Sequence, residues 1–194
     1  RSVGVTGVQT CALPILFERL LVEHCAPTLA GIKTANLFSY SGDDAISKVR
    51  HWNRLLYKLR LRLTILSNFK GKTLIYIYRI DLLNKTLSDS RVRNFLKIYG
   101  YDKQISCGKV IKNLSLRVKK DDFPHEIGVF LGYPLEDVKL FIKNKGKNYK
   151  VSGIWKVYTD ESESLKKFEM YKKCTSTLCE SFLKGVNITS LCAA

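Results

Sequence analysis

The sequence has few of the features that mark secreted, membrane-spanning or metal-binding proteins. No two cysteines are separated by two residues, which is the spacing that metal sites commonly use. The longest apolar run, 73–78, has strand length and falls far short of the roughly 20 residues of a membrane span. No secretory signal is visible, and the five cysteines after residue 15 are odd in number and irregularly spaced. We therefore expect reduced thiols, a cytoplasmic location, and neither a membrane nor a metal partner.

The first fifteen residues do not read as part of a natural domain. Residues 5–15 have the sequence VTGVQTCALPI, a codon-by-codon translation of a widely used sequencing-adapter strand. A signal peptide fits poorly, because Gln9, Thr10 and Pro14 interrupt the short apolar run and no small-residue cleavage site follows. We expect residues 1–15 to be an artefactual leader and residues 16–194 to form a single domain.

Positive charge is the strongest compositional signal. The chain has 33 lysines and arginines against 17 aspartates and glutamates, a formal net charge of +16. A basic surface attracts nucleic acid, phosphorylated ligands or acidic partners. The lysines are spread along the whole chain, as a lysine-rich coding bias would also produce. Composition therefore leaves open both a charge-driven binding function and an ordinary solvated surface.

Hydrophobic periodicity predicts helices packed on a small sheet. Helical spacing of apolar residues indicates helices at 16–25, ended by Pro27, and at 43–59, with Ile46, Val49, Leu55 and Leu56 on the buried side. Strands at 61–65 and 73–78 form a hairpin around Gly71, and a further strand lies within 28–40. More helices are expected at 79–99, with a cap at Ser88 or Asp89, and at 105–119 and 162–184; residues 186–191 are expected to add a strand. The pattern is typical of an α+β fold with a small mixed or antiparallel sheet and five or more helices.

A helical hairpin is predicted near 124–144. Its two short helices are separated by Gly132, Tyr133 and Pro134. The spacing resembles a helix-turn-helix unit. However, Glu136 and Asp137 open the second helix, where carboxylates repel DNA and suit the positive end of the helix dipole. A structural hairpin is favoured over a DNA-recognition element.

Three segments together resemble a known family. They read HCAPTLAG at 24–31 followed by NLF at 36–38, PHEIG at 124–128 followed by LGYPLEDV at 131–138, and WKVY at 155–158. These segments are similar to domain-of-unknown-function family 3793, an uncharacterised family found mainly in anaerobic Gram-positive bacteria, and the resemblance covers 16–194. Ser152 stands where many relatives are expected to have a cysteine. The resemblance implies no established activity or cofactor.

Two groups of residues in these segments are candidates for a site. Small residues between Thr28 and Asn36 let the backbone approach a phosphorylated ligand that Lys33 could contact, although Ala26 replaces the first glycine of a phosphate-binding loop. Cys25 and His125 form a candidate nucleophile and base, although the C-terminal end of a helix dipole raises a thiol pKa. The candidate ligand-binding residues are His24, Cys25, Thr28, Lys33, Asn36, His125, Glu126 and Tyr133.

The leading hypothesis is a non-enzymatic cytoplasmic binding or regulatory module for an anionic partner, either nucleic acid or a phosphorylated ligand. The alternative is an enzyme or a metal- or cofactor-binding protein that uses the Cys25 and His125 motifs. Geometry separates the two hypotheses. Convergence of Cys25, Lys33 and His125 on one cleft would favour the alternative.

Overall fold

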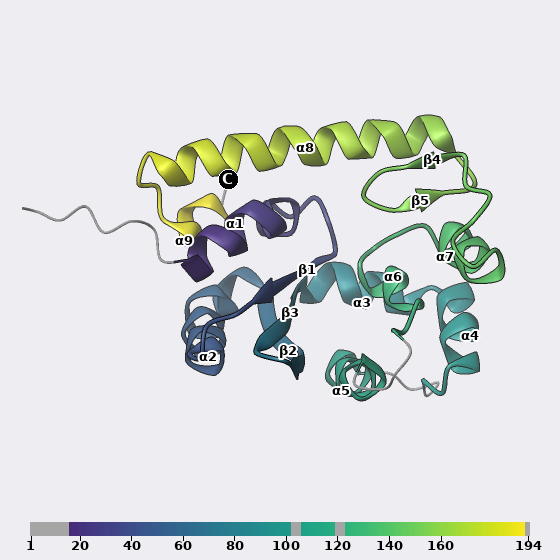
Figure 1. Ribbon diagram of the computed structural model, residues 1–194, viewed down its shortest axis with the longest axis horizontal. Helices are drawn as coiled ribbons and strands as arrows, with labels where there is room; N and C mark the ends of the chain where they lie inside the picture. The colour runs from purple at the N-terminus through teal and green to yellow at the C-terminus, as the bar shows by residue number, and fades with distance from the viewer. Residues whose placement is uncertain (1–15, 102–105, 119–122, 193–194) are drawn as a thin grey trace, which may run out of the picture.

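The computed structural model describes residues 16–101, 106–118 and 123–192. Within these residues the chain forms nine α-helices, one short 3-10 helix, a three-stranded sheet and a two-stranded hairpin (Figure 1). The predicted α+β class is therefore confirmed. The expected artefactual leader, residues 1–15, lies outside the described residues.

The central sheet is antiparallel, with strand order β1-β3-β2. Its strands are β1 (Ala35–Tyr40), β2 (Leu61–Phe69) and β3 (Lys72–Arg79). The predicted hairpin joins β2 to β3 through Lys70 and Gly71, both of which have positive φ (48° and 74°). Because side chains alternate along a strand, Ile75 and Ile77 face one core while Tyr76 between them faces the other. The sheet therefore separates two hydrophobic cores.

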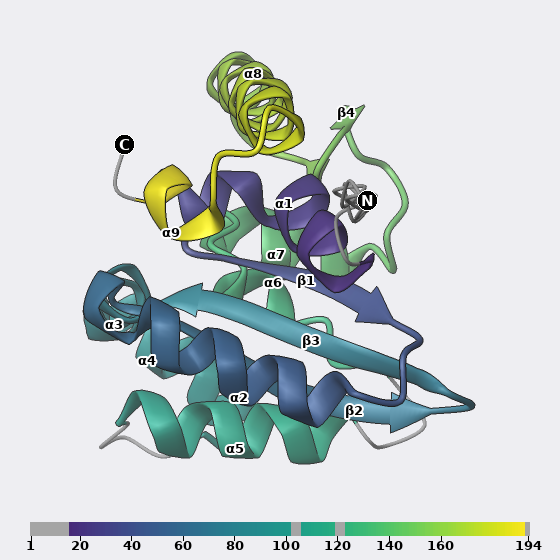
Figure 2. The same ribbon diagram turned by 90° about the vertical axis from the view of Figure 1, so that its left-hand side faces the viewer.

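Helices cover both faces of the sheet. On one face lie α1 (Leu16–Leu29) and α2 (Ala45–Leu56), followed by the 3-10 helix η1 (Tyr57–Leu59). Figure 2 shows α1 over the sheet, with α8 (Glu161–Leu183) lying over α1 in turn. The other core is formed with α3 (Ile80–Ser88), α4 (Ser90–Ile98), α5 (Cys107–Val118), α6 (Ile127–Phe130) and α7 (Leu135–Lys143).

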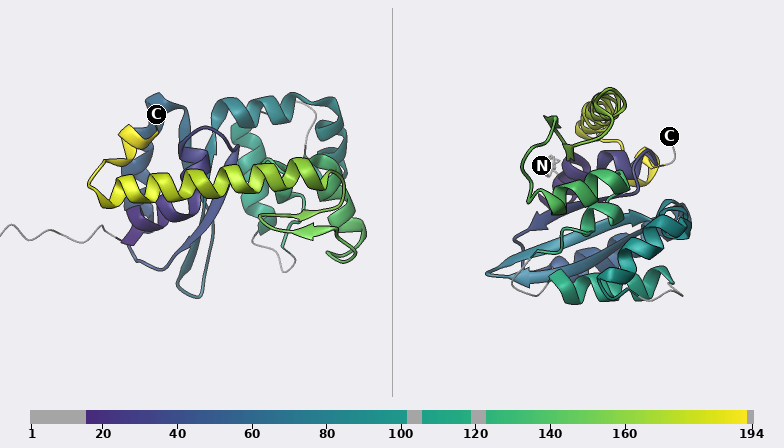
Figure 3. Two further views of the ribbon diagram at one scale, coloured as in Figure 1. Left: turned by 90° about the horizontal axis from the view of Figure 1, so that it is seen from above. Right: turned by 90° about the vertical axis from the view of Figure 1, so that its right-hand side faces the viewer.

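A small hairpin and the long C-terminal helix complete the fold. Strands β4 (Val151–Ser152) and β5 (Lys156–Val157) pair antiparallel, and Trp155 and Val157 pack with Tyr171 of α8 in a third, minor cluster. Seen from above in Figure 3, α8 runs the length of the molecule, from this hairpin to the short helix α9 (Ile188–Leu191). This helix thus joins the two ends of the fold.

Three details differ from the sequence-based expectations. Pro27 lies inside the last turn of α1 rather than beyond its end, because Pro27, Thr28 and Leu29 are all buried and packing holds the turn. Residues 186–191 form no strand; instead Asn187 caps α9 by accepting a hydrogen bond from the Ser190 N–H at 2.8 Å. Of the four residues expected on the buried side of α2, Val49 and Leu56 are buried, but Ile46 and Leu55 are exposed on either flank of the buried face, which Ala45 and Trp52 complete.

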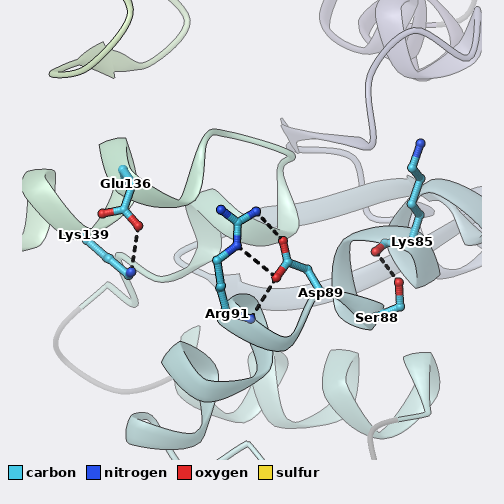
Figure 4. A network of polar contacts seen from close by, with 6 residues as sticks. All are labelled: Lys85, Ser88, Asp89, Arg91, Glu136 and Lys139. Carbon is cyan, nitrogen blue, oxygen red and sulfur yellow. Dashed lines mark hydrogen bonds and ion pairs between the residues drawn. The ribbon is translucent and has the colours of Figure 1, made fainter.

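The predicted helix break at Ser88–Asp89 is confirmed. Asp89 caps α4 by accepting a hydrogen bond from the Arg91 N–H at 2.8 Å. The Arg91 guanidinium also donates to this carboxylate at 2.8 Å, and these bonds lower the pKa of Asp89 to about 2. Figure 4 shows Arg91 between Asp89 and the Lys139–Glu136 ion pair of α7. The corner between α3 and α4 is therefore fixed by local polar contacts.

The predicted helical hairpin near 124–144 is also present, as α6 and α7. Gly132 takes the positive φ (79°) that the turn requires. A Cβ on Gly128 would lie 2.8 Å from a Val138 methyl group, so the two helices approach as closely as a glycine permits. In the described ranges, no helix combines the length and apolar character that crossing a membrane would need.

Candidate functional site

The turn between α1 and β1 is held by an arginine from the far end of β3. Arg79 donates from Nε to the Thr28 carbonyl at 2.9 Å and from Nη2 to the Leu29 carbonyl at 2.5 Å. A cation at this position stabilises the negative end of the helix dipole. Gly31 has positive φ (81°), and a Cβ there would lie 3.1 Å from the guanidinium carbon of Arg79. This contact explains why a glycine stands in the HCAPTLAG segment.

Lys33 leaves this turn pointing into the protein. The residue is only 4% exposed, and its ammonium group donates to the Ala35 carbonyl. Burial lowers the pKa of Lys33 to about 8, an effect that Cys25 partly opposes. Among the described residues, no carboxylate lies within 4.0 Å of this ammonium group. Lys33 is therefore a buried cation without an ionic partner.

A cavity of about 510 Å³ opens beside Lys33, between α1, the turn of the β4–β5 hairpin and α8. Its polar lining includes His24, Lys33, Asn36 and Lys172. Its apolar lining includes Pro27, Ile154, Phe168 and Tyr171. The carboxylate at the rim, Glu23, is paired with Arg19 at 2.7 Å. We call this cavity the Lys33 cleft.

A second cavity, of about 350 Å³, lies between α6, α7 and the same hairpin. Its lining is dominated by aromatic rings, from Phe123, His125, Tyr133, Phe141 and Trp155. Gly153 and Ile154, at the hairpin turn, line both cavities. The hairpin turn therefore separates a cationic cleft from an aromatic one.

Asp137 fixes the hairpin to α7. The carboxylate is 1% exposed and accepts four hydrogen bonds. They come from Trp155 Nε1 at 2.8 Å, the Tyr158 N–H at 3.0 Å, and the N–H and hydroxyl of Thr159 at 2.9 and 2.8 Å. A buried carboxylate with this many donors is a structural group. The Asp137 side chain is therefore fully engaged inside the protein. A DNA-recognition helix, in contrast, would need the residues of its first turn to be exposed.

Several predicted site residues come together around the Lys33 cleft. His24, Lys33 and Asn36 line it. Thr28 is buried next to the cleft and donates its hydroxyl hydrogen to Asn36 Oδ1 at 2.7 Å. The Tyr133 ring lies 5.3 Å from the Lys33 ammonium nitrogen. The small-residue segment between Thr28 and Asn36 thus brings side chains to one place.

The other predicted residues do not join this group. Cys25 is fully buried in the core, and burial raises the pKa of its thiol. His125 lines the aromatic cavity, where its ring packs against Phe141 at 5.1 Å. Glu126 is buried in an ion pair with Arg117 and accepts from the Tyr101 hydroxyl at 3.3 Å. No cluster of three His, Cys, Asp or Glu side chains suited to a metal ion occurs in the part of the chain that the structure describes.

The segments that build the cleft also identify the chain. The model of the family described as "Protein of unknown function (DUF3793)" matches residues 21–192. The chain belongs to this family. The match confirms the resemblance seen in the sequence, and it covers every residue that lines the Lys33 cleft. Neither the curated proteins nor the solved structures contain a match.

The DUF3793 family description names no activity, so functional inference depends on the geometry. Sequence patterns did not indicate the cleft residues supplied by α8, namely Phe168, Tyr171 and Lys172. A signal was present in the spacing of the inward residues Ser164, Phe168, Tyr171 and Thr175, which form one helical face. That spacing indicates that one face of α8 packs against the rest of the protein, but it does not indicate that the contacting element is α1.

Proposed function

We propose that the protein is a non-enzymatic binding module for a small organic anion, bound in the Lys33 cleft. The observation that carries this proposal is the buried Lys33 ammonium without a carboxylate partner. Burying an unpaired charge costs several kcal/mol even after relaxation, and a ligand anion would offset that cost. A ligand phosphate or carboxylate would be the missing counter-charge.

The walls of the cleft indicate the rest of the ligand. Lys172 and His24 add basic groups, and Asn36 has its Oδ1 held by Thr28, so that its amide N–H groups can donate to an anion. Phe168 and Tyr171 offer aromatic surface to the other end of the ligand. Small-molecule sites commonly combine mostly apolar walls with a few convergent polar groups. The ligand class is therefore a phosphate or carboxylate attached to an apolar or aromatic body.

A cytoplasmic regulatory role is the setting that we propose for this binding. Cys25 and Cys192 are buried as free thiols, a state maintained by a reducing compartment. The ligand would stabilise contacts between α1, the hairpin and α8, since it would touch all three. Ligand binding would then reduce the movement of α1, the hairpin and α8 relative to one another, and this change would be the regulatory signal.

No observation favours the alternative of an enzyme or a cofactor-binding protein built on Cys25 and His125. Cys25 lies in the core and its thiol pKa is raised, whereas a reactive cysteine needs a lowered pKa and access to solvent. His125 and Lys33 line different cavities.

Phenyl phosphate is a suitable probe, because it joins a dianion to an aromatic ring. Calorimetric titration near neutral pH should give saturable binding to the wild type. Lys33→Met, which keeps the length of the side chain, should weaken binding by at least about tenfold, equivalent to about 1.4 kcal/mol. The matched control is Lys173→Met, an exposed lysine of α8 outside the cleft, and it should retain the wild-type Kd. Equal binding by the wild type and Lys33→Met would refute the proposal.

A further inference from the structure

A second basic feature lies away from the cleft, on α2 and the strand that follows it. Between Asp44 and Asp81 the chain contains nine lysines and arginines and no carboxylate. One of the nine, Lys48, is paired with Glu18 at 3.0 Å. Five others are consecutive cations of α2, η1 and early β2, and none has a carboxylate within 4.0 Å in the described ranges: Arg50, Arg54, Lys58, Arg60 and Arg62. Positive charge is therefore concentrated here, with two carboxylates, Asp43 and Asp44, at one end, where they line a hollow together with Arg50 and Arg54.

Arg50, Arg54 and Lys58 share one outward surface of α2 and η1. The opposite side of α2 is buried through Val49, Trp52 and Leu56. Arg50, Arg54 and Lys58 are exposed and follow one another at four-residue intervals, about 6 Å apart along a helix axis. Arg60 takes a left-handed conformation (φ 62°) that ends η1 and starts β2. The turn thus adds Arg60 at the end of the row. Arg62 projects from the other face of β2 and reaches the row through its contact with Tyr57.

Aromatic surface accompanies the charge. The Tyr57 ring is 58% exposed, and the Arg62 guanidinium carbon lies 4.4 Å from its centroid. His51 is exposed on the same helix. Guanidinium groups bind phosphates in bidentate fashion and stack on aromatic planes, and four of the five cations are arginines. This composition suits a phosphate backbone with bases or sugars nearby better than it suits an acidic protein surface.

We propose that this surface, the α2 basic face (Arg50, Arg54, Tyr57, Lys58, Arg60 and Arg62), binds nucleic acid through its phosphate backbone. A row of cations at four-residue intervals, such as Arg50, Arg54 and Lys58, matches a partner with regularly repeated negative charge. Figure 1 shows α2 on the opposite side of the molecule from α8. The face is therefore independent of the Lys33 cleft, and failure of one proposal leaves the other standing.

Salt dependence of binding provides the test. Fluorescence anisotropy would follow a duplex DNA of about 16 base pairs, and the matching RNA, between about 50 and 200 mM salt. Each phosphate contact contributes about 0.9 to the slope of log K against log salt concentration. The triple variant Arg50→Gln, Arg54→Gln, Lys58→Gln should therefore lower the slope by about 3 units and weaken binding at least about tenfold at the lower salt concentration.

A matched triple variant controls for net charge. Lys166, Lys173 and Lys184 are exposed on or just after α8, and changing all three to Gln removes the same charge from the other side of the molecule. This variant should change the slope by less than about 1 unit. Equal losses in the two triple variants, with unchanged thermal unfolding, would mean that net charge alone attracts DNA and would overturn the proposal. Tighter binding to vesicles of anionic lipid than to either nucleic acid would also overturn it.

Discussion

The Lys33 ammonium nitrogen lies 5.3 Å from the centroid of the Tyr133 ring. These residues are a hundred positions apart in the sequence, one in the turn after α1 and the other in the turn between α6 and α7. A cation over an aromatic face gains about 0.5–2 kcal/mol, which offsets part of the cost of burying Lys33. The contact also connects the wall of the Lys33 cleft to the wall of the aromatic cavity, since Tyr133 lines the latter.

Because these two turns approach closely, we expect that Gly132 cannot be replaced by a larger residue without loss of stability. A Cβ at Gly132 would lie 2.7 Å from Thr34 Oγ1, and the residue has φ of 79°. Gly132→Ala should therefore lower the free energy of unfolding by about 2–4 kcal/mol, from backbone strain and from the clash. Urea denaturation measures this change.

Gly100→Ala supplies the matched control. Gly100 has a similar φ of 83°, but a Cβ there would meet nothing within 4 Å. This variant should show the backbone cost alone, about 1 kcal/mol. If the two variants lose the same stability, the turns do not pack as closely as described.

The carboxylate of Asp137 is predicted to hold the β4–β5 hairpin to α7. Asp137→Asn places an amide N–H group opposite a donor, because Trp155 Nε1 and the Thr159 and Tyr158 donors occupy both oxygens. We expect a loss of about 2–4 kcal/mol in the free energy of unfolding. Denaturation followed by tryptophan fluorescence measures it. The neighbouring Glu136→Gln, whose exposed ion pair with Lys139 contributes little, should cost less than about 0.5 kcal/mol; a comparable loss there would argue against a special role for Asp137.

Glu126 is predicted to be structural rather than part of a ligand site. Its buried carboxylate binds Arg117 and the Tyr101 hydroxyl, which join α5 and the segment after α4 to the start of α6. Glu126→Gln should lower the free energy of unfolding by about 1–3 kcal/mol. Calorimetric affinity for phenyl phosphate, measured well below the unfolding temperature, should not change. A weakened affinity in the folded variant would place Glu126 in the binding machinery after all.

The lowered pKa of Lys33 predicts a pH dependence of stability. Lys33 binds its proton less tightly in the folded protein (about 8) than in the unfolded chain (about 10.5). Between these values the unfolded chain carries more protons, so the contribution of Lys33 to the free energy of unfolding rises with pH, while below about pH 8 its full burial cost remains. From about pH 7.5 to 9.5, the wild type should gain up to about 2 kcal/mol relative to Lys33→Met.

The comparison with Lys33→Met also removes other titrations. Cys25 acts in the opposite direction, because burial raises its thiol pKa and stability falls as pH rises above the ordinary value of about 9.0. That loss occurs in both proteins and cancels in their difference, except for the further rise in the Cys25 pKa that removing the Lys33 charge would cause. A difference that stays constant over this pH range would show that Lys33 is not buried as a charged group.

Most of the helices and turns could be predicted from the sequence, but few of the residues that form the Lys33 cleft could. The β2–β3 hairpin, the cap at Asp89 and the α6–α7 hairpin were predictable because period-2 alternation, a capping carboxylate and a glycine turn act between near neighbours. Errors arose where tertiary packing overrode local preference. Pro27 stays helical because its turn is buried, and Leu55 is exposed because α2 packs through Trp52 and Leu56.

The candidate site was predictable only in part for the same reason. Part of one wall was identified from the sequence: Lys33 and Asn36 from the small-residue segment 28–36, and His24 from the neighbouring motif. The opposite wall comes from α8, whose position over α1 depends on contacts between segments more than a hundred residues apart. No local pattern indicates that Tyr171 and Lys172 face Lys33 across a cavity.

Direct titration of Lys33 tests the central claim that its buried ammonium group binds a ligand anion. The ¹³Cε resonance of Lys33, assigned by its absence in Lys33→Met, would be followed against pH in the free protein and with saturating phenyl phosphate. We predict a midpoint near 8 in the free protein and an upward shift with phenyl phosphate, because an anion binds the protonated form more tightly. A midpoint at the ordinary lysine value of about 10.5, or one that phenyl phosphate leaves unchanged, would contradict the account.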